Sequence, residues 1–249
     1  MKKILLILLL IGSISSVLCQ KSTDKLYDLR NELQTKQEDS ARVSLNLKIG
    51  KIYLESKNDS SLYYLKNALK LANKIESSVQ IPDVLYAMGS YYYGKNEYNL
   101  AIIRYKEAAT FYKSMDNYKK EALMYNNIGY NYFNLYAEDR ASEYYLKSLS
   151  LYRKISDEDG QGVNLLDIGN LYYDQENYNY ANKYFKEALT IFKKLNDSIG
   201  IANCYTNIGN ATADSGDYRG GLDFFNKSIA IEDQLNDPYG IAINYNNIP

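Results

Sequence analysis

The stretch MYNNIGYNY, residues 124–132, decides the fold, because close copies of it recur along the chain at a fixed interval. Its glycine belongs to a series in which each member follows an apolar residue and lies 40 residues after the one before. The series comprises Gly89, Gly129, Gly169 and Gly209. Gly50 precedes the first member by 39 residues, and Pro249 stands where the next glycine would fall. Self-similarity at a period of a few tens of residues indicates a repeat architecture.

Each repeat predicts two helices. In the segment ANKYFKEALTIFKKL, residues 181–195, apolar or small side chains recur at steps of three and four. They are Ala181, Tyr184, Phe185, Ala188, Leu189, Phe192 and Leu195, and lysines occupy the other face. This spacing is that of one face of an α-helix. The segment before it, residues 163–175, has a predicted packed face of Leu165, Ile168, Gly169 and Tyr172. Asn and Asp in the polar turns between helices can act as N-caps.

Small and aromatic residues recur at further fixed positions after each glycine. Position 12 holds Ala101, Ala141, Ala181 and Gly221, and position 16 holds Tyr105, Tyr145, Phe185 and Phe225. Small residues let helices approach closely, and we expect the aromatic rings to fill the space between neighbouring repeats. One helix pair cannot bury its own apolar face, so successive pairs must stack. The predicted fold class is therefore all-α, a right-handed superhelical solenoid of antiparallel helix pairs.

These residues resemble the tetratricopeptide-repeat family. The segments Tyr125-x2-Ile128-Gly129-x2-Tyr132 and Ala181-x3-Phe185-x2-Ala188 match the family pattern and its spacing. The resemblance covers residues 41–249, with two departures: the period is 40 rather than 34, and the proline that closes the second helix is missing. Exported arrays of this "NNIG" kind are similar to the sensor halves of Bacteroidota-type signalling proteins. The resemblance therefore implies a binding scaffold whose first helices line a concave surface.

The chain is predicted to have three parts. Residues 1–19 combine MKK, an apolar run and a small-residue exit, which is the pattern of a secretory signal. They predict export to the periplasm or the extracellular space; cleavage after Cys19, lipid attachment at Cys19 and an uncleaved membrane anchor are the alternatives. Residues 20–40 are expected to form a capping helix. Residues 41–249 are expected to hold five repeats and a truncated sixth.

Composition disfavours several classes of function. The chain has no His, which removes the commonest neutral-pH general base and metal ligand. The formal charge of the chain is −1, and the sequence has no cluster of basic residues of the kind that phosphate contacts need. No nucleic-acid partner is therefore predicted. We interpret GQG, residues 160–162, as an inter-repeat loop and the acidic run 157–159 as a solvated loop without a metal. Cys204 is expected to be a semi-buried structural thiol. No catalytic residue, cofactor or metal is predicted.

A polar column two positions before each glycine is the candidate binding site. It comprises Asn127, Asp167, Asn207 and Asn247. Tyr130, Asn170 and Asn210 follow the glycines directly, and Tyr93, Phe133 and Tyr173 come four positions after them. An Asn side chain can both donate and accept, which suits the backbone amides of an extended peptide. The alternative is that each Asn bonds the neighbouring repeat and fixes the stacking angle, and the two roles are compatible.

Two function classes follow. The first is an exported scaffold that binds a protein or peptide in its concave groove, either as the sensor or interaction part of a larger signalling protein or as a stand-alone periplasmic or lipid-anchored assembly scaffold. The second, an enzyme built on the repeats, has no motif to support it. At the end of the sequence, INYNNIP predicts a sixth repeat begun at about Ile241. Ile241, Tyr245 and Ile248 are expected to pack on the fifth repeat and to leave an apolar end for self-association.

Overall fold

The structure is a computed structural model that describes residues 25–248. All regular structure in that range is helical. The chain divides into two compact units, one ending at Ala108 and the other beginning at Ala109, and each is described by itself. The predicted signal segment, residues 1–19, lies outside the described residues, as does Pro249.

In the described part of the first unit, a helix over residues 25–35 is followed by three complete helices. These are α2 (Asp39–Glu55), α3 (Ser60–Lys74) and α4 (Gln80–Gly94). The boundary between the units falls within α5 (Tyr98–Ser114). Leu29 of the first helix is buried in a cluster with Leu45, Ile49 and Tyr53 of α2. The helix over residues 25–35 therefore covers apolar side chains of α2.

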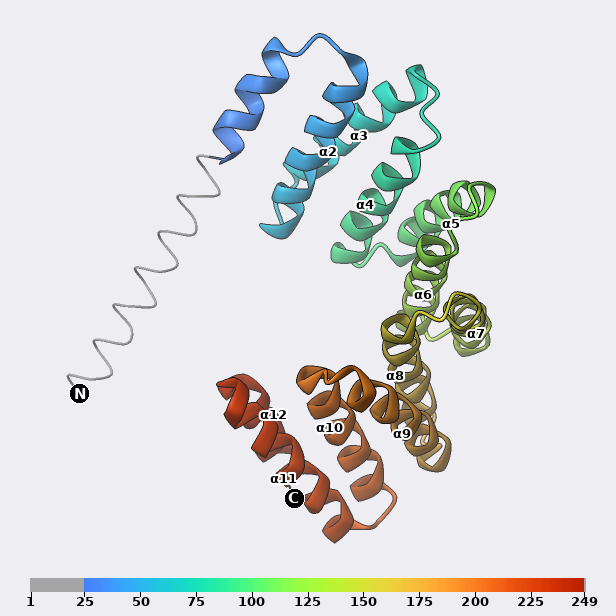
Figure 1. Ribbon diagram of the computed structural model, residues 1–249, viewed down its shortest axis with the longest axis vertical. Coiled ribbons are helices and arrows are strands. Elements are labelled where there is room, and N and C mark those ends of the chain that lie inside the picture. The colour runs from blue at the N-terminus through green and yellow to red at the C-terminus, as the bar shows by residue number, and fades with distance from the viewer. Residues whose placement is uncertain (1–24, 249) are drawn as a thin grey trace, which may run out of the picture. The chain divides into compact units, whose positions relative to one another are not determined.

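The second unit consists of three further helix pairs and a final helix. The pairs are α6 (Tyr118–Asn134) with α7 (Glu138–Lys154), α8 (Glu158–Asp174) with α9 (Tyr178–Leu195), and α10 (Ser198–Asp214) with α11 (Tyr218–Leu235); α12 (Pro238–Asn247) follows. Within each pair the two helices run antiparallel and pack along their lengths (Figure 1). The predicted fold class, an all-α solenoid of antiparallel helix pairs, is confirmed.

Asp and Asn side chains set where these helices begin. Asn177 and Asp217 cap the second helices α9 and α11, as predicted, because their side chains accept from the backbone N–H three residues later. Asp157 caps α8 in the same way by accepting from the N–H of Gly160. The interpretation of GQG as a loop was therefore wrong, because the cap starts the helix at Glu158 and places residues 160–162 in its first turns.

The final helix also begins earlier than predicted. Asp237 accepts from the N–H groups of Tyr239 and Gly240, and Pro238 occupies the first helical position, where a missing N–H has no cost. The helix α12 therefore starts at Pro238 rather than at about Ile241. Its buried residues are Gly240 and Asn244, whereas Tyr245 is 62% exposed. The prediction that Tyr245 packs on the fifth repeat was wrong, because Asn244 faces the fifth repeat and the next residue, Tyr245, points away from it.

The repeated glycines let an aromatic ring reach the backbone within each helix pair. A Cβ atom added at Gly209 would lie 2.6 Å from a ring carbon of Phe225, so no larger residue fits unless the ring moves. Gly169 faces Phe185 in the same way. Phe185 also belongs to a buried cluster with Ile208 and Ala211 of the next repeat. The expectation that this aromatic column fills the space between repeats is confirmed for Phe185.

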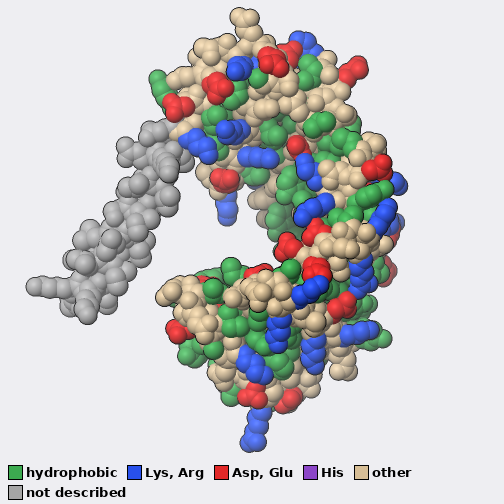
Figure 2. Space-filling model, viewed as in Figure 1, with side chains coloured by type: hydrophobic (Ala, Val, Ile, Leu, Met, Phe, Trp, Pro, Cys, Tyr) green, Lys and Arg blue, Asp and Glu red, His purple; other side chains and the backbone are tan. Residues whose placement is uncertain are grey.

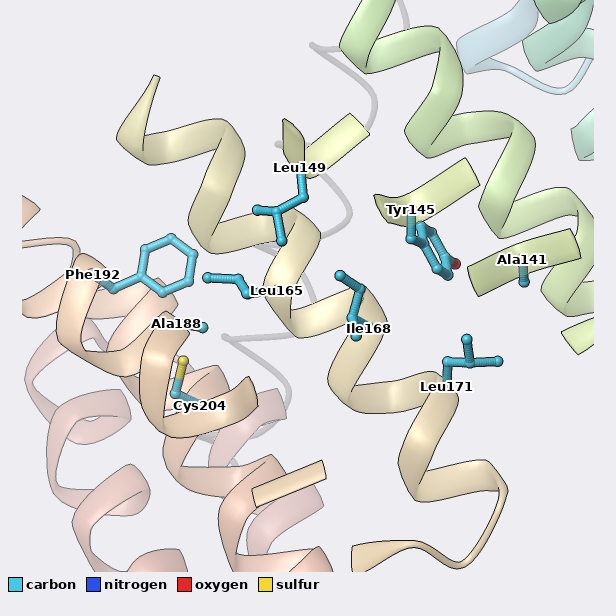
Figure 3. Close-up of a cluster of buried hydrophobic side chains, with 9 residues drawn as sticks. All are labelled: Ala141, Tyr145, Leu149, Leu165, Ile168, Leu171, Ala188, Phe192 and Cys204. Carbon is cyan, nitrogen blue, oxygen red and sulfur yellow. The ribbon is translucent and has the colours of Figure 1, made fainter. Parts of the chain in front are cut away.

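A second aromatic contact joins one helix pair to the next. Phe192, near the end of α9, lies against Gly200 at the start of α10, where an added Cβ would be 2.5 Å from the ring. In Figure 3, Leu165 of α8 points toward the ring of Phe192 of α9, and Leu149 of α7 belongs to the same core. Cys204 of α10 belongs to the same core and is fully buried, deeper than predicted, and burial raises the pKa of its thiol to about 12.

Candidate peptide-binding groove

A groove of about 400 Å³ runs along the first helices of the last repeats in the second unit. Residues of α8, α10 and α12 line it. Five of the ten predicted site residues meet there: Asp167, Asn170, Asn207, Asn210 and Asn247. Asn203 and Thr206 add polar groups, and Val163, Leu166 and Ile243 supply apolar surface. The groove is thus rich in side-chain amides.

Helical periodicity explains which residues reach the groove. The lining positions on α8 are 163, 166, 167 and 170, and those on α10 are 203, 206, 207 and 210. Steps of three, four and seven define one face of an α-helix. Asn203 and Thr206 were not predicted as site residues, because they fall outside the repeat columns of the residues that were predicted. A step of four back from Asn207 reaches Asn203, and a step of three forward from Asn203 reaches Thr206, so helical spacing would have found both.

The asparagines of the groove differ in how far they are already engaged. Asn207 donates through Nδ2 to Oδ1 of Asn170 at 3.4 Å, which links α10 to the neighbouring α8. Asn210 and Asn203 have no hydrogen-bond partner among the described residues. This hydrogen bond of Asn207 supports the alternative role, in which the polar column fixes how the repeats stack. At Asn210 the amide is free to bind a ligand.

Asp167 is the single carboxylate of the groove lining, and no Lys or Arg of the described chain lines it. Its Oδ2 atom accepts from Asn126 Nδ2 of the preceding repeat at 2.8 Å. The Oδ1 atom of Asn126 in turn accepts from Asn164, so α6 and α8 are joined by an amide–carboxylate chain. Burial raises the pKa of Asp167 to about 6, and the bond from Asn126 lowers it in part. The groove therefore gains a negative charge as the pH rises past about 6.

The other five predicted site residues are not among those that line this groove. Asn127 donates to the backbone oxygen of Leu123 in its own helix at 2.8 Å. Tyr130 stacks on Phe133 with ring centroids 6.4 Å apart. Tyr173 packs on Tyr178 and donates its hydroxyl to Asp214, and burial raises its pKa.

Tyr93 lies in the first unit, where its ring meets that of Tyr98 at 6.0 Å. The position four after the glycine falls in the last turn of the first helix. Tyr93 and Tyr173 there pack against the first residue of the second helix of their own pair. These two rings thus close the turn within a pair.

The acidic run 157–159 has a structural role rather than lying in a loop. Besides capping α8, Asp157 pairs with Lys119 at 2.8 Å, and Glu158 pairs with Lys194. Residues 25–248 contain no group of three or more His, Cys, Asp or Glu placed to hold a metal ion. Within the same range, no helix has the length and apolar character needed to cross a membrane.

The fold and the amide-lined groove define a helical-repeat scaffold of the kind that binds other proteins. A family comparison gives the particular class: residues 120–194 and 162–234 match the tetratricopeptide repeat. These overlapping matches span residues 120–234, and this part of the chain is thus similar to the tetratricopeptide-repeat family, which confirms the resemblance. Proteins of this fold are typically non-catalytic interaction scaffolds. A search of curated proteins gave no match.

Solved structures agree on the fold. BtubC from P. vanneervenii superposes with a TM-score of 0.74 at 16% identity, over 87% of this chain and 90% of its own. The signal-transduction ATPase PH0952 from Pyrococcus horikoshii, which has a tetratricopeptide-repeat sensor, gives 0.77 at 15% identity. The match covers 86% of this chain but 33% of PH0952. A Rap protein complexed with competence and sporulation factor gives 0.63 at 12% identity, over 92% and 70% of the two chains.

Proposed function

We propose that this protein binds an extended peptide segment of a partner protein in the groove formed by α8, α10 and α12. The observation that carries this proposal is the convergence of Asn170, Asn207, Asn210 and Asn247 on one groove with Asp167 beside them. Side-chain amides can pair with both the N–H and the C=O groups of an extended backbone. Val163, Leu166 and Ile243 add apolar contact area between these amides, as in other peptide grooves.

The groove also selects for charge. Its one ionisable lining residue is Asp167, and the oxygen that Asn126 does not bond is left for a ligand. A peptide with a Lys or Arg side chain, or with its amino terminus at this point, would form a charge-assisted hydrogen bond. We therefore expect basic rather than acidic peptides to be preferred at neutral pH.

The setting we propose is that of an exported sensor or interaction part of a larger signalling protein. The secretory pattern of residues 1–19 supports export. Two neighbours in fold carry related descriptions: PH0952 has a repeat-built sensor in a signal-transduction ATPase, and the Rap protein is complexed with a factor. A stand-alone periplasmic or lipid-anchored assembly scaffold is the alternative.

The experiment begins with selection of binders from a phage-displayed library of random peptides against the full chain. Binding of the selected peptides is then measured for Asn210→Ala and for the double variant with Asn207→Ala. We expect the double variant to lose about tenfold or more in affinity, since each hydrogen bond to a ligand contributes on the order of 1 kcal/mol. Asn226→Ala is the matched control, because Asn226 is exposed on α11 outside the groove.

Thermal melting of the same variants separates binding from stacking. Asn210 has no partner among the described residues, so its loss should leave the melting temperature unchanged. If the peptides bind the double variant as tightly as the parent chain, the groove is not the binding site. If affinity and melting temperature fall together for Asn210→Ala, the amides stabilise the repeats and the proposal fails.

We also propose that a second copy of this chain binds at α12. On α12, Ile243 is 37% exposed and Tyr245 is 62% exposed, which provides apolar surface beside the groove. We expect Tyr245→Ser to shift a monomer–dimer equilibrium toward monomer, as measured by sedimentation velocity. A parent chain that sediments as a monomer at every concentration would exclude this contact.

A further inference from the structure

A second cavity, in the first unit, has a different chemistry from the groove. It is a pocket of about 610 Å³ between the helix over residues 25–35, α2 and α3. Pockets of a few hundred Å³ are large enough for a drug-sized ligand. The residues that form it all lie before Ala108, so it belongs to one compact unit.

The lining of this pocket is cationic. Arg30, Arg42 and Lys70 reach it from three different helices, and the described lining contains no Asp or Glu. Lys70 has no ion-pair or hydrogen-bond partner among the described residues. Arg42 has one weak partner, Asp39, at 3.7 Å, and Asp39 is itself bonded to Lys74 at 2.6 Å. The positive charge of the pocket is therefore largely uncompensated.

Arg30 is held in place by two tyrosines. Its Nε atom donates to the Tyr64 hydroxyl at 3.2 Å, and a terminal nitrogen donates to the Tyr53 hydroxyl. The guanidinium lies 5.4 Å from the centre of the Tyr53 ring, and the Tyr53 and Tyr64 rings stack at 5.6 Å. These contacts fix the guanidinium before a ligand arrives and leave its remaining N–H groups to bind an anion. Such preorganisation lowers the entropy cost of binding.

Aromatic surface lies beside the cations. Tyr64 and Tyr63 both line the pocket and meet edge to face at 5.2 Å, and Tyr63 is 64% exposed. Gln34 and Asn67 add amides without partners among the described residues. A ligand that fits has an anionic group for the three cations and a flat, polar-edged body for the tyrosine rings.

From this arrangement we propose that the pocket binds the phosphomonoester group of a ligand, with the ligand's body against Tyr63 and Tyr64. A phosphomonoester carries nearly two negative charges and several acceptor oxygens, which match two guanidinium groups and an ammonium group better than one carboxylate would. In Figure 2, several Lys and Arg side chains lie over this end of the first unit, with Asp and Glu side chains among them. The site is independent of the peptide groove.

The test measures binding of adenosine monophosphate and inorganic phosphate to the full chain by isothermal titration calorimetry. Adenosine monophosphate should bind at one site, more tightly than inorganic phosphate, and binding should weaken as salt is added. Lys70→Gln and Arg42→Gln should each weaken binding by about tenfold, since one charge-assisted hydrogen bond is lost in each. Tyr63→Ala should weaken adenosine monophosphate binding and leave phosphate binding unchanged.

Lys66→Gln is the matched control, because Lys66 is exposed on α3 but does not line the pocket, and the charge change is the same. A vesicle experiment tests whether the bound phosphate group belongs to a lipid headgroup. Phosphatidylcholine vesicles with and without phosphatidic acid are sedimented with each variant. Binding to phosphatidic acid that Lys70→Gln abolishes and Lys66→Gln does not would assign the same site to a headgroup. The proposal is wrong if neither probe binds, or if Lys66→Gln weakens binding as much as the pocket variants do.

Discussion

Two boundaries between repeats in the second unit occupy the same register and are built from different chemistry. Between α9 and α10, the ring of Phe192 lies on Gly200 and shares a core with Cys204. Forty residues later, between α11 and α12, Glu232 takes the place of the phenylalanine, against Gly240. Asn244 takes the place of the cysteine.

The polar boundary is held by side-chain hydrogen bonds. Glu232 is 6% exposed, and Asn244 Nδ2 donates to both of its carboxylate oxygens, at 3.0 and 2.9 Å. Thr206 donates to Asn244 Oδ1 at 3.1 Å. Ser228 Oγ lies 3.2 Å from the Glu232 carboxylate and 2.9 Å from the backbone oxygen of Ala202, so its one proton can go to only one of these two acceptors. One backbone geometry can therefore be held either by ring packing or by a buried polar network. The second requires every member to be present.

Of the changes considered, removal of the Phe192 ring at the apolar boundary should lower the free energy of unfolding most. Phe192→Ala deletes a buried ring from between two glycines, and such a change typically lowers the free energy of unfolding by about 3–5 kcal/mol. Urea denaturation measures the change, with Leu195→Ala, at an exposed position of the same helix, as the control. A loss no greater than that of the control would show that the ring does not hold the boundary.

Addition of a methyl group on the opposite side of the same contact should have a smaller effect. In Gly200→Ala the new Cβ would lie 2.5 Å from the Phe192 ring, and overpacking of this kind costs about 1–3 kcal/mol. Gly94→Ala is the control, because nothing lies within 4 Å of a Cβ at that position. Phe192→Leu should partly rescue Gly200→Ala in a double-mutant cycle; additive losses would contradict direct contact.

The polar boundary should respond to the loss of charge rather than of volume. Glu232→Gln keeps the shape and one acceptor but places an amide against Asn244 Nδ2, and we expect a loss of about 1–2 kcal/mol in unfolding free energy. The double change Glu232→Phe with Asn244→Cys copies the apolar boundary. It should be more stable than Glu232→Phe alone, and the opposite order would show that the two boundaries are not interchangeable.

The groove carboxylate contrasts with Glu232, because Asp167 has a single neutral donor. Its pKa is raised by burial from an ordinary value near 4 to about 6. The contribution of Asp167 to stability is therefore greatest below about pH 4 and is lost as the pH rises through about 6. The change in the free energy of unfolding caused by Asp167→Asn should therefore be more favourable at pH 7 than at pH 4, by about 1 kcal/mol.

Denaturation of the parent chain, Asp167→Asn and the exposed-site control Asp139→Asn at the two pH values measures this difference. The same difference at both sites would mean that burial does not perturb Asp167.

The sequence predicted most of the fold because each repeat carries its own local instructions. Period-40 glycines, helical spacing of apolar residues and Asn or Asp at the turns all act within a few residues of one another. Two helix starts were predicted wrongly because an N-cap residue begins a helix in a segment whose composition is typical of a loop. GQG and the start of α12 contain Gly or Pro, yet Asp157 and Asp237 fix helix starts ahead of them.

The sequence by itself determined the class of protein, the helix pairs, the recurring glycine and aromatic positions and the polar character of the candidate groove. Only the tertiary structure decided that Asp167, Asn207 and Asn247 line one groove while Asn127 bonds its own helix. It also decided that Glu232 is paired with Asn244 and that Arg30, Arg42 and Lys70 share a pocket. The physical reason is that side-chain partners across helices depend on how each helix is rotated about its axis against its neighbours. Packing over many residues sets that rotation, and no single repeat encodes it.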